Sequence, residues 1–437
     1  MKAVGTLLSF ALACITLQAQ SIGLDKNAKP GPPRLVVVGD SLSAGVQNFS
    51  LLDTQQPHGF ASVVAAQAGW PLTLPLVPYP GSPNVLVFDP NTLQIVPAPG
   101  TLPNPPRDNP GEQPTNIAIP GLTVGSALTS RPSWAALKPG ANPEELWATI
   151  VLGFPNLYRN QAPTEIEQAV ELKPDLLIEW LGNNDALVPA LFGQINTLTP
   201  VAQFAASYEQ VLAKLSKTHA KLVTATIPDV TEIAYFTSPQ TIANQTGAPL
   251  TYIMRALEIG SNDYVRPTAQ AFIPGILANP ATGPLPTYCP SPLPSFLSSP
   301  LPCILRDADA RTVRAAINCY NLIITTETLL HGGVVVDIHE LVDQIYKSGY
   351  KLRSGEILTT DFFGGLFSLD GIHPTDAGYA VIANEFITTM NAGLHTNIPP
   401  ASVESIFKAD PLMPLANPHY TFRSSPPGSG AFCLTSN

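Results

Sequence analysis

Three residues of this chain have the side chains and the spacing that nucleophilic catalysis requires. Ser41 lies in a turn that follows the apolar run 35–38, and Asp370 precedes His373 by three residues. A serine hydroxyl becomes a nucleophile when a base removes its proton, and the imidazole of histidine is a common base. In a tight turn, the spacing of Asp370 and His373 lets the carboxylate hold imidazole Nδ1, which leaves Nε2 free to accept that proton. Together these residues would carry out acyl transfer through a covalent serine intermediate.

Acyl transfer also needs hydrogen-bond donors that stabilise the oxyanion, and two further positions can supply them. Gly121 ends a short apolar segment. A glycine lets its backbone N–H approach a substrate oxygen with no side chain in the way. Asn184 follows the apolar segment 176–181, and its side-chain amide is a second donor. The backbone N–H of Ser41 is a third, so the expected oxyanion hole consists of Ser41, Gly121 and Asn184.

Each of these residues also has a purely structural interpretation. The alternatives are a helix N-cap for Ser41, a turn cap for Asp370, a structural histidine before a proline for His373, a turn glycine for Gly121 and an Asx turn for Asn184. Taken singly, none of the residues is specific. The prediction therefore depends on their order along the chain and on the strands that precede them.

Strands that alternate with helices must position these side chains. Residues 35–38 are four apolar residues, three of them β-branched, which is typical of a strand buried on both faces of a parallel sheet. Similar segments occur at 116–120, 176–181, 221–227 and 334–338. The connections are long enough for crossovers, so we predict an α/β fold: a three-layer α/β/α sandwich with a parallel sheet of about five strands. Its ligand crevice would lie past the carboxyl ends of the strands.

Helical spacing of apolar residues fills most of the intervals between these strands. It predicts helices over 59–69, 123–129, 144–152, 164–172, 201–219, 250–257, 311–330, 341–347 and 375–393. Two proline-rich segments, at about 72–115 and 228–307, show little periodicity and are expected to be long loop insertions. Within the first, residues 85–88 and 93–96 could pair as a hairpin. The domain is thus expected to span 34–395, with a proline- and serine-rich tail at 399–437.

Composition excludes several classes of partner and cofactor. The 437-residue chain has a net charge of −10, only 12% charged residues and no cluster of Lys and Arg, so a nucleic-acid partner is not expected. It contains neither C-x-x-C nor H-E-x-x-H, so no metal and no other cofactor is expected. Nothing in the sequence indicates an oligomeric state.

The N-terminus has the pattern of a secretory signal peptide. An early Lys2 precedes an apolar run over about 4–17, and small residues follow near Ala19. We therefore expect a signal peptide over 1–19 and an exported protein, periplasmic or extracellular. Leu12-Ala13-Cys14 loosely matches a lipoprotein box, so anchoring through Cys14 is an alternative. No other run reaches about 18 unbroken apolar residues, and no transmembrane span is expected.

The cysteines fit export. If Cys14 leaves with the signal peptide, four remain, and an even count in an exported chain favours disulfides. Cys289 and Cys303 flank a proline-rich loop and are predicted to pair. Cys319 could then pair with Cys433, but it also lies in a helical pattern and could be a core residue.

Four sequence blocks resemble those of the SGNH, or GDSL, hydrolases in identity, order and strand context. They are Gly39-Asp40-Ser41-Leu42, Asn116-x-Ala-x-Pro120-Gly121, Gly182-Asn183-Asn184-Asp185 and Asp370-x-x-His373. The resemblance implies an SGNH, flavodoxin-like sandwich. It also implies that Ser41 is the nucleophile, His373 the base and Asp370 its orienting partner, with Ser41, Gly121 and Asn184 forming the oxyanion hole.

The expected function is that of an exported serine ester hydrolase, an esterase or lipase acting on a small-molecule, lipid or glycan ester. Phospholipase, thioesterase and carbohydrate deacetylase activity on the same site are alternatives, because fold does not choose among them. A further alternative is an exported binding protein on an inactive hydrolase scaffold. The four intact residues Ser41, Asn184, Asp370 and His373 argue against it.

Overall fold

The computed structural model of the protein describes residues 31–91, 94–138, 140–289 and 301–410, and the backbone of 421–424 and 432–435. The expected signal peptide over 1–19, including Cys14, lies outside the described residues. None of the described helices is both long and apolar enough to cross a membrane.

A sheet of four parallel strands forms the centre of the domain, as the apolar runs predict. In spatial order the strands are β1 (Leu35–Gly39), β4 (Leu176–Trp180), β5 (Lys221–Ala225) and β10 (Val334–Val336). Gly39 at the end of β1 lies opposite Trp180 at the end of β4. The segments that follow these two strands therefore leave the sheet side by side, and they carry Ser41 and Asn184.

The fifth predicted strand, at 116–120, runs along β1 but forms only part of a ladder. Val37 donates its N–H to Thr115 O at 2.9 Å, Ile117 to Val37 O at 3.0 Å and Ile119 to Gly39 O at 2.9 Å. In a regular parallel ladder, the Gly39 N–H would next reach the Ile117 carbonyl. It donates instead to the Glu165 side chain. The fifth strand is thus reduced to a single bridge between Val37 and Asn116.

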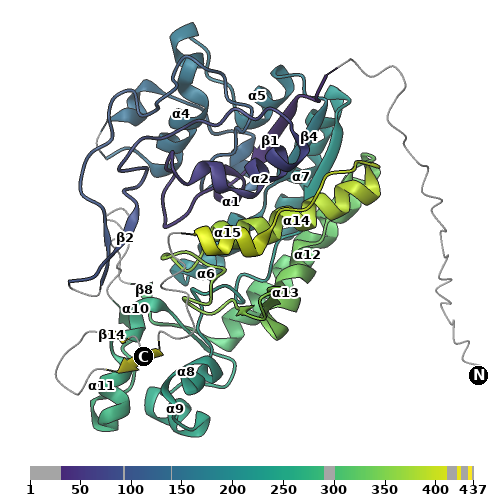
Figure 1. The fold of residues 1–437 in the computed structure, drawn as a ribbon. Coiled ribbons are helices and arrows are strands. Elements are labelled where there is room, and N and C mark those ends of the chain that lie inside the picture. The colour runs from purple at the N-terminus through teal and green to yellow at the C-terminus, as the bar shows by residue number, and fades with distance from the viewer. Residues whose placement is uncertain are drawn as a thin grey trace, which may run out of the picture.

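Helices cover both faces of the sheet, which confirms the three-layer prediction (Figure 1). One core cluster joins the sheet to α3 (Val124–Ala127), α4 (Pro143–Asn156), α5 (Glu165–Glu171), α6 (Asn183–Phe192), α7 (Val201–Leu215) and α12 (Asp307–Leu330). The other joins it to α2 (Phe60–Ala68), α13 (Ile338–Ser348) and α14 (Asp376–Gly393). Alternate residues of β1 enter the two clusters, since Val36 and Val38 belong to the first and Leu35 and Val37 to the second.

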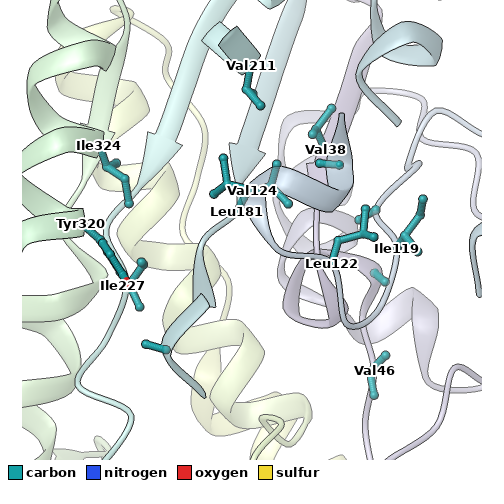
Figure 2. Close-up of a cluster of buried hydrophobic side chains, with 14 of the residues drawn as sticks. Val38, Val46, Ile119, Leu122, Val124, Leu181, Val211, Ile227, Tyr320 and Ile324 are labelled. Carbon is teal, nitrogen blue, oxygen red and sulfur yellow. The ribbon is translucent and has the colours of Figure 1, made fainter. Parts of the chain in front are cut away.

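The first cluster reaches the ends of the strands where the candidate residues lie. Figure 2 shows Val124, from the segment after Gly121, beside Leu181, the residue that directly follows β4. The turns that present the candidate residues thus rest on a continuous apolar core.

The predicted helices are present, with small shifts at their ends. The pattern over 250–257 matches α9 (Leu250–Leu257), and α12 begins at Asp307 rather than at 311. The tail contains a helix that the sequence pattern did not predict, α15 (Val403–Ala409). The short strands are β6 (Tyr264–Val265), β7 (Tyr288–Cys289), β8 (Leu301–Pro302), β9 (Ile304–Leu305), β11 (Tyr350–Lys351), β12 (Ile357–Leu358), β13 (Thr421–Ser424) and β14 (Phe432–Thr435).

The two proline-rich insertions differ in character. The first contains the predicted hairpin, β2 (Leu86–Asp89) and β3 (Gln94–Pro97). The second is not a loop but a group of helices, α8 (Pro239–Thr246), α9, α10 (Pro267–Gln270) and α11 (Ile273–Ala278), with a separate hydrophobic cluster. The loop expectation was wrong there because proline lies in the first turn of three of these helices, where a missing N–H costs nothing.

The second insertion is joined to the sheet domain by a buried arginine and closed by a disulfide. Arg266 donates to Ala190 O in α6 at 2.7 Å and to Pro302 O at 2.8 Å. The predicted pair Cys289–Cys303 is confirmed, with a Cα–Cα distance of 5.2 Å.

Cys319 is a free, exposed thiol on α12, so its interpretation as a core residue was wrong. The side chain of Cys433 lies outside the described residues. Figure 1 shows α8, α9 and α11 grouped away from β1 and β4.

Candidate active site

Asp370 and His373 form the hydrogen bond that their spacing predicts. His373 Nδ1 lies 2.8 Å from Asp370 Oδ2, and both side chains are buried. The other carboxylate oxygen, Oδ1, accepts the N–H groups of Ile372 at 2.7 Å and of His373 at 2.8 Å. Asp370 is therefore both a turn cap and a partner of the imidazole, so the structural and the catalytic interpretations are compatible.

The balance of interactions keeps Asp370 ionised. Burial alone would raise the pKa of this carboxyl group. The His373 imidazole and the two backbone N–H donors outweigh burial, and the net pKa of Asp370 is lowered from its ordinary value. A carboxylate in this position favours the imidazole tautomer with a proton on Nδ1, which leaves Nε2 as the acceptor.

Ser41 is the first residue of the short helix α1 (Ser41–Ala44), directly after β1. The N-cap is Asp40, whose Oδ1 accepts the Leu42 N–H at 3.0 Å, so the N-cap interpretation of Ser41 was wrong. The turn is tightly packed: a Cβ on Gly39 would lie 2.7 Å from both Ser43 Cβ and the Trp180 carbonyl oxygen. Only glycine fits there, and this close packing fixes where the chain turns toward Ser41.

The turn that carries His373 is bound to the segment just after α1. The Asn48 N–H donates to Ser368 Oγ at 2.9 Å, and Asn48 Oδ1 accepts the Leu369 N–H at 3.0 Å. The Phe49 N–H donates to Asp370 Oδ2 at 2.5 Å. These bonds place the His373 turn against the Ser41 segment. Among the described residues, the His373 side chain is hydrogen-bonded to Asp370 and not to Ser41. In enzymes without substrate, the hydrogen bond between nucleophile and base is often long.

Gly121 and Asn184 lie on adjoining segments. Asn184 Nδ2 donates to the carbonyl oxygen of Leu122 at 3.0 Å, which leaves its second N–H for another acceptor. Asp185 binds the same region, because its Oδ2 accepts the Val124 N–H at 3.0 Å. Gly121 has φ +81°, a conformation that favours glycine. Asn184 is the second residue of α6 and not part of a loop Asx turn.

A contact that sequence reasoning missed joins the Ser41 turn to the Asn184 turn. Asn183 Nδ2 donates to Asp40 Oδ2 at 2.9 Å, and both side chains are buried. Asp40 and Asn183 both belong to sequence blocks that resemble those of the SGNH hydrolases, and this was the available sequence signal for their importance. Their pairing across the ends of β1 and β4 was not readable from the local sequence.

Four buried carboxyl groups belong to, or lie close to, the turns that carry Ser41 and Asn184. Burial raises the pKa of Asp40 and of Asp185 to about 6, and that of Glu179 to about 8. Burial also raises the pKa of Glu165 well above its ordinary value, and the charges of Glu179 and Asp40 raise it further. Of these, the sequence analysis singled out neither Glu165 nor Glu179. Both lie in ordinary helix or strand patterns with no local mark of their position.

Within the described ranges, no group of three or more His, Cys, Asp or Glu side chains could hold a metal ion. The residues described above offer hydroxyl, imidazole, carboxylate and amide groups. These are the kinds of group that general-base-assisted nucleophilic attack on a carbonyl carbon uses.

Comparison with known protein families gives a match over most of the chain. Residues 35–386 match the family model of GDSL-like lipases and acylhydrolases. No curated protein sequence matches the chain.

Several solved structures match most of this chain at low similarity. An acetylxylan esterase from Geobacillus stearothermophilus is 12% identical over 85% of this chain and 96% of its own, with a TM-score of 0.36. A lipase/acylhydrolase from Enterococcus faecalis is 12% identical over 84% and 100%, with a TM-score of 0.33. An alpha/beta hydrolase enzyme from the metagenome of Lake Arreo is 14% identical over 82% and 95%, with a TM-score of 0.35. At these scores the likenesses say nothing about activity.

The raised pKa of Glu179 predicts that stability falls as pH rises. Between about pH 4.5 and 8 the folded state keeps a proton on Glu179 that the unfolded state releases. One such proton makes the free energy of unfolding fall by about 1.4 kcal/mol per pH unit. Glu179→Gln should reduce the slope between pH 6 and 8 by up to that amount, measured by urea denaturation. Glu171→Gln, at an exposed position of α5, is the control. An unchanged slope in Glu179→Gln would contradict the assignment.

Proposed function

Since the chain belongs to the GDSL-like lipase/acylhydrolase family and is a carboxylic ester hydrolase, we propose that it acts through an acyl-enzyme on Ser41. The observation that carries this proposal is the buried Asp370–His373 hydrogen bond, in a turn that is itself bound to the segment after Ser41. This arrangement supports the proposal that Ser41 and His373, which are more than 300 residues apart in the sequence, act together as nucleophile and base.

In the proposed first step, His373 Nε2 accepts the Ser41 proton as Ser41 Oγ attacks the ester carbonyl carbon. The carbonyl oxygen becomes an oxyanion, and Asp370 stabilises the imidazolium that forms. His373 then donates the proton to the leaving alcohol, which departs and leaves an acyl group on Ser41. In the second step, His373 activates a water molecule, whose attack releases the acid and restores Ser41.

The proposed oxyanion donors are the backbone N–H groups of Ser41 and Gly121 and the free N–H of the Asn184 amide. The bond from Asn184 to Leu122 O supports this role, because it fixes the amide plane and leaves one donor hydrogen over. A donor that is already oriented costs no reorganisation when negative charge develops on the substrate oxygen.

We further propose that the protein is exported and acts on small-molecule, lipid or glycan esters. The Cys289–Cys303 disulfide supports export, since disulfides persist in oxidising compartments. The signal-peptide pattern over 1–19 supports it independently.

Replacing the Ser41 hydroxyl should abolish turnover. Ser41→Ala should lose all measurable hydrolysis of p-nitrophenyl esters from acetyl to palmitoyl, and should fail to react with a serine-directed phosphonate. Ser43→Ala is a matched control in the same helix, because Ser43 Oγ is buried and has no hydrogen-bond partner in the part of the chain that the structure describes. Ser43→Ala should keep wild-type turnover. Activity retained in Ser41→Ala would overturn the proposed mechanism, and an unlabelled wild type would favour a binding protein.

The pH profile tests the role of His373. Because imidazole must be neutral to accept a proton, kcat/KM should fall on the acid side of the profile. Burial raises the pKa of Asp40 to about 6, so this carboxyl group could produce an acid limb as well. If His373 is the base, the acid limb should persist in Asp40→Asn. A profile without an acid limb would argue against His373 as the base.

Removing the Asn184 amide should act on the chemical step. Asn184→Ala should lower kcat about 10²–10³-fold, the usual effect of losing one oxyanion donor, and should change KM far less. Steady-state kinetics with p-nitrophenyl acetate measures both values. A loss confined to KM would assign Asn184 to substrate binding instead.

A further inference from the structure

The backbone N–H of Gly39, two residues before Ser41, is held by a side chain from a distant helix. It donates to Glu165 Oε1 at 2.7 Å, from a residue 126 positions away in the sequence. Glu165 is the first residue of α5 and is completely buried. Its second oxygen, Oε2, has no hydrogen-bond partner among the described residues. The contact to Gly39 is thus the specific interaction that this buried carboxyl group makes.

This contact replaces a bond that the sheet would otherwise supply. The ladder between β1 and the segment 115–119 is regular on either side of this position, and a continued ladder would join the Gly39 N–H to the Ile117 carbonyl. The carboxyl group of Glu165 takes that amide instead. The ladder therefore lacks one internal bond, at the residue where the chain turns toward Ser41, although the Gly39 carbonyl still accepts the Ile119 N–H.

A buried glutamate also binds a backbone N–H at the end of the neighbouring strand, β4. Glu179 Oε1, on β4, accepts the Leu181 N–H at 3.0 Å, just before the turn that presents Asn184. Its Oε2 accepts the Tyr208 hydroxyl of α7 at 2.8 Å. A backbone amide near the end of each of the two strands that lead into the site is thus fixed by a buried glutamate.

We propose that Glu165 is a positioning residue for ester hydrolysis, holding the Gly39 amide and so fixing the place of Ser41 relative to His373. The proposal rests on the proposed function of Ser41 and His373. Misplacement of a reacting atom by about 1 Å can cost 10²-fold in rate, so an anchor two residues from the nucleophile matters to catalysis. To bind the Gly39 N–H, residue 165 needs an acceptor oxygen on a side chain as long as that of glutamate.

The surroundings of Glu165 indicate that charge is not the requirement. The charged groups that act on Glu165 are the carboxyl groups of Glu179 and Asp40, and both disfavour a second negative charge. Burial acts in the same direction and more strongly. A neutral carboxyl group accepts the Gly39 N–H through its carbonyl oxygen, and a glutamine can do the same.

The test compares three substitutions of Glu165 by kcat and KM for p-nitrophenyl acetate and by the rate of Ser41 labelling with a phosphonate. Glu165→Gln keeps the acceptor and should retain kcat to within about threefold of the wild type. Glu165→Asp is one methylene shorter, and Glu165→Leu has no acceptor. Both should lower kcat and the labelling rate about 10–100-fold while changing KM less than about threefold. Glu171→Leu, at an exposed position of the same helix, should match the wild type.

The outcomes separate the possible roles. Folded Glu165→Asp or Glu165→Leu with wild-type kcat overturns the proposal, as does a Glu165→Gln variant as impaired as Glu165→Leu. If Glu165→Leu does not fold, Glu165→Asp decides. If neither folds, Glu165 stabilises the fold rather than positioning Ser41, and the proposal is overturned. A wild-type enzyme that is not labelled at Ser41 refutes the proposed function itself, whereas normal wild-type labelling with unaffected variants refutes this proposal alone.

Discussion

Close packing at Gly39 is the constraint on which the site depends. The end of β1 lies so near the end of β4 that no side chain fits at this position, because a Cβ would collide with Ser43 and with the Trp180 carbonyl. The chain must therefore turn out of the sheet at one place. Asp40 then caps the helix that begins at Ser41. The position of Ser41, the proposed nucleophile, follows from sheet geometry, because Ser41 lies only two residues after the last residue of β1.

From that fixed point, hydrogen bonds tie together segments that are far apart in the sequence. Asn183 donates to the Asp40 carboxylate, and the neighbouring Asn184 donates to the Leu122 carbonyl. The Phe49 N–H donates to the Asp370 carboxylate. Each bond links two of the four sequence blocks or the segments beside them. Because these groups are buried, a broken bond would leave a polar atom without water to replace it. The arrangement is consequently one cooperative unit.

The sequence predicted the frame of the molecule and the contact between Asp370 and His373, because both have local signals. The apolar runs of β1 and β4 mark buried strands, and the three-residue spacing of Asp370 and His373 marks their bond. What has no local signal was missed. Glu165 reaches Gly39 across 126 residues, and nothing near Glu165 distinguishes it from other residues at the start of a helix. Three helices of the second insertion, α8, α10 and α11, were missed because proline, which breaks a helix in its interior, lies in the first turn of each of them.

The second insertion has its own hydrophobic cluster and its own disulfide, and Arg266 binds it to α6, the helix that carries Asn184. Part of the insertion nevertheless belongs to the core of the sheet domain, since Ile233, Tyr235 and Phe236 lie in the first core cluster. A substitution inside the insertion's own cluster can therefore alter that unit without repacking the sheet, whereas a substitution at these three residues acts on the sheet core directly.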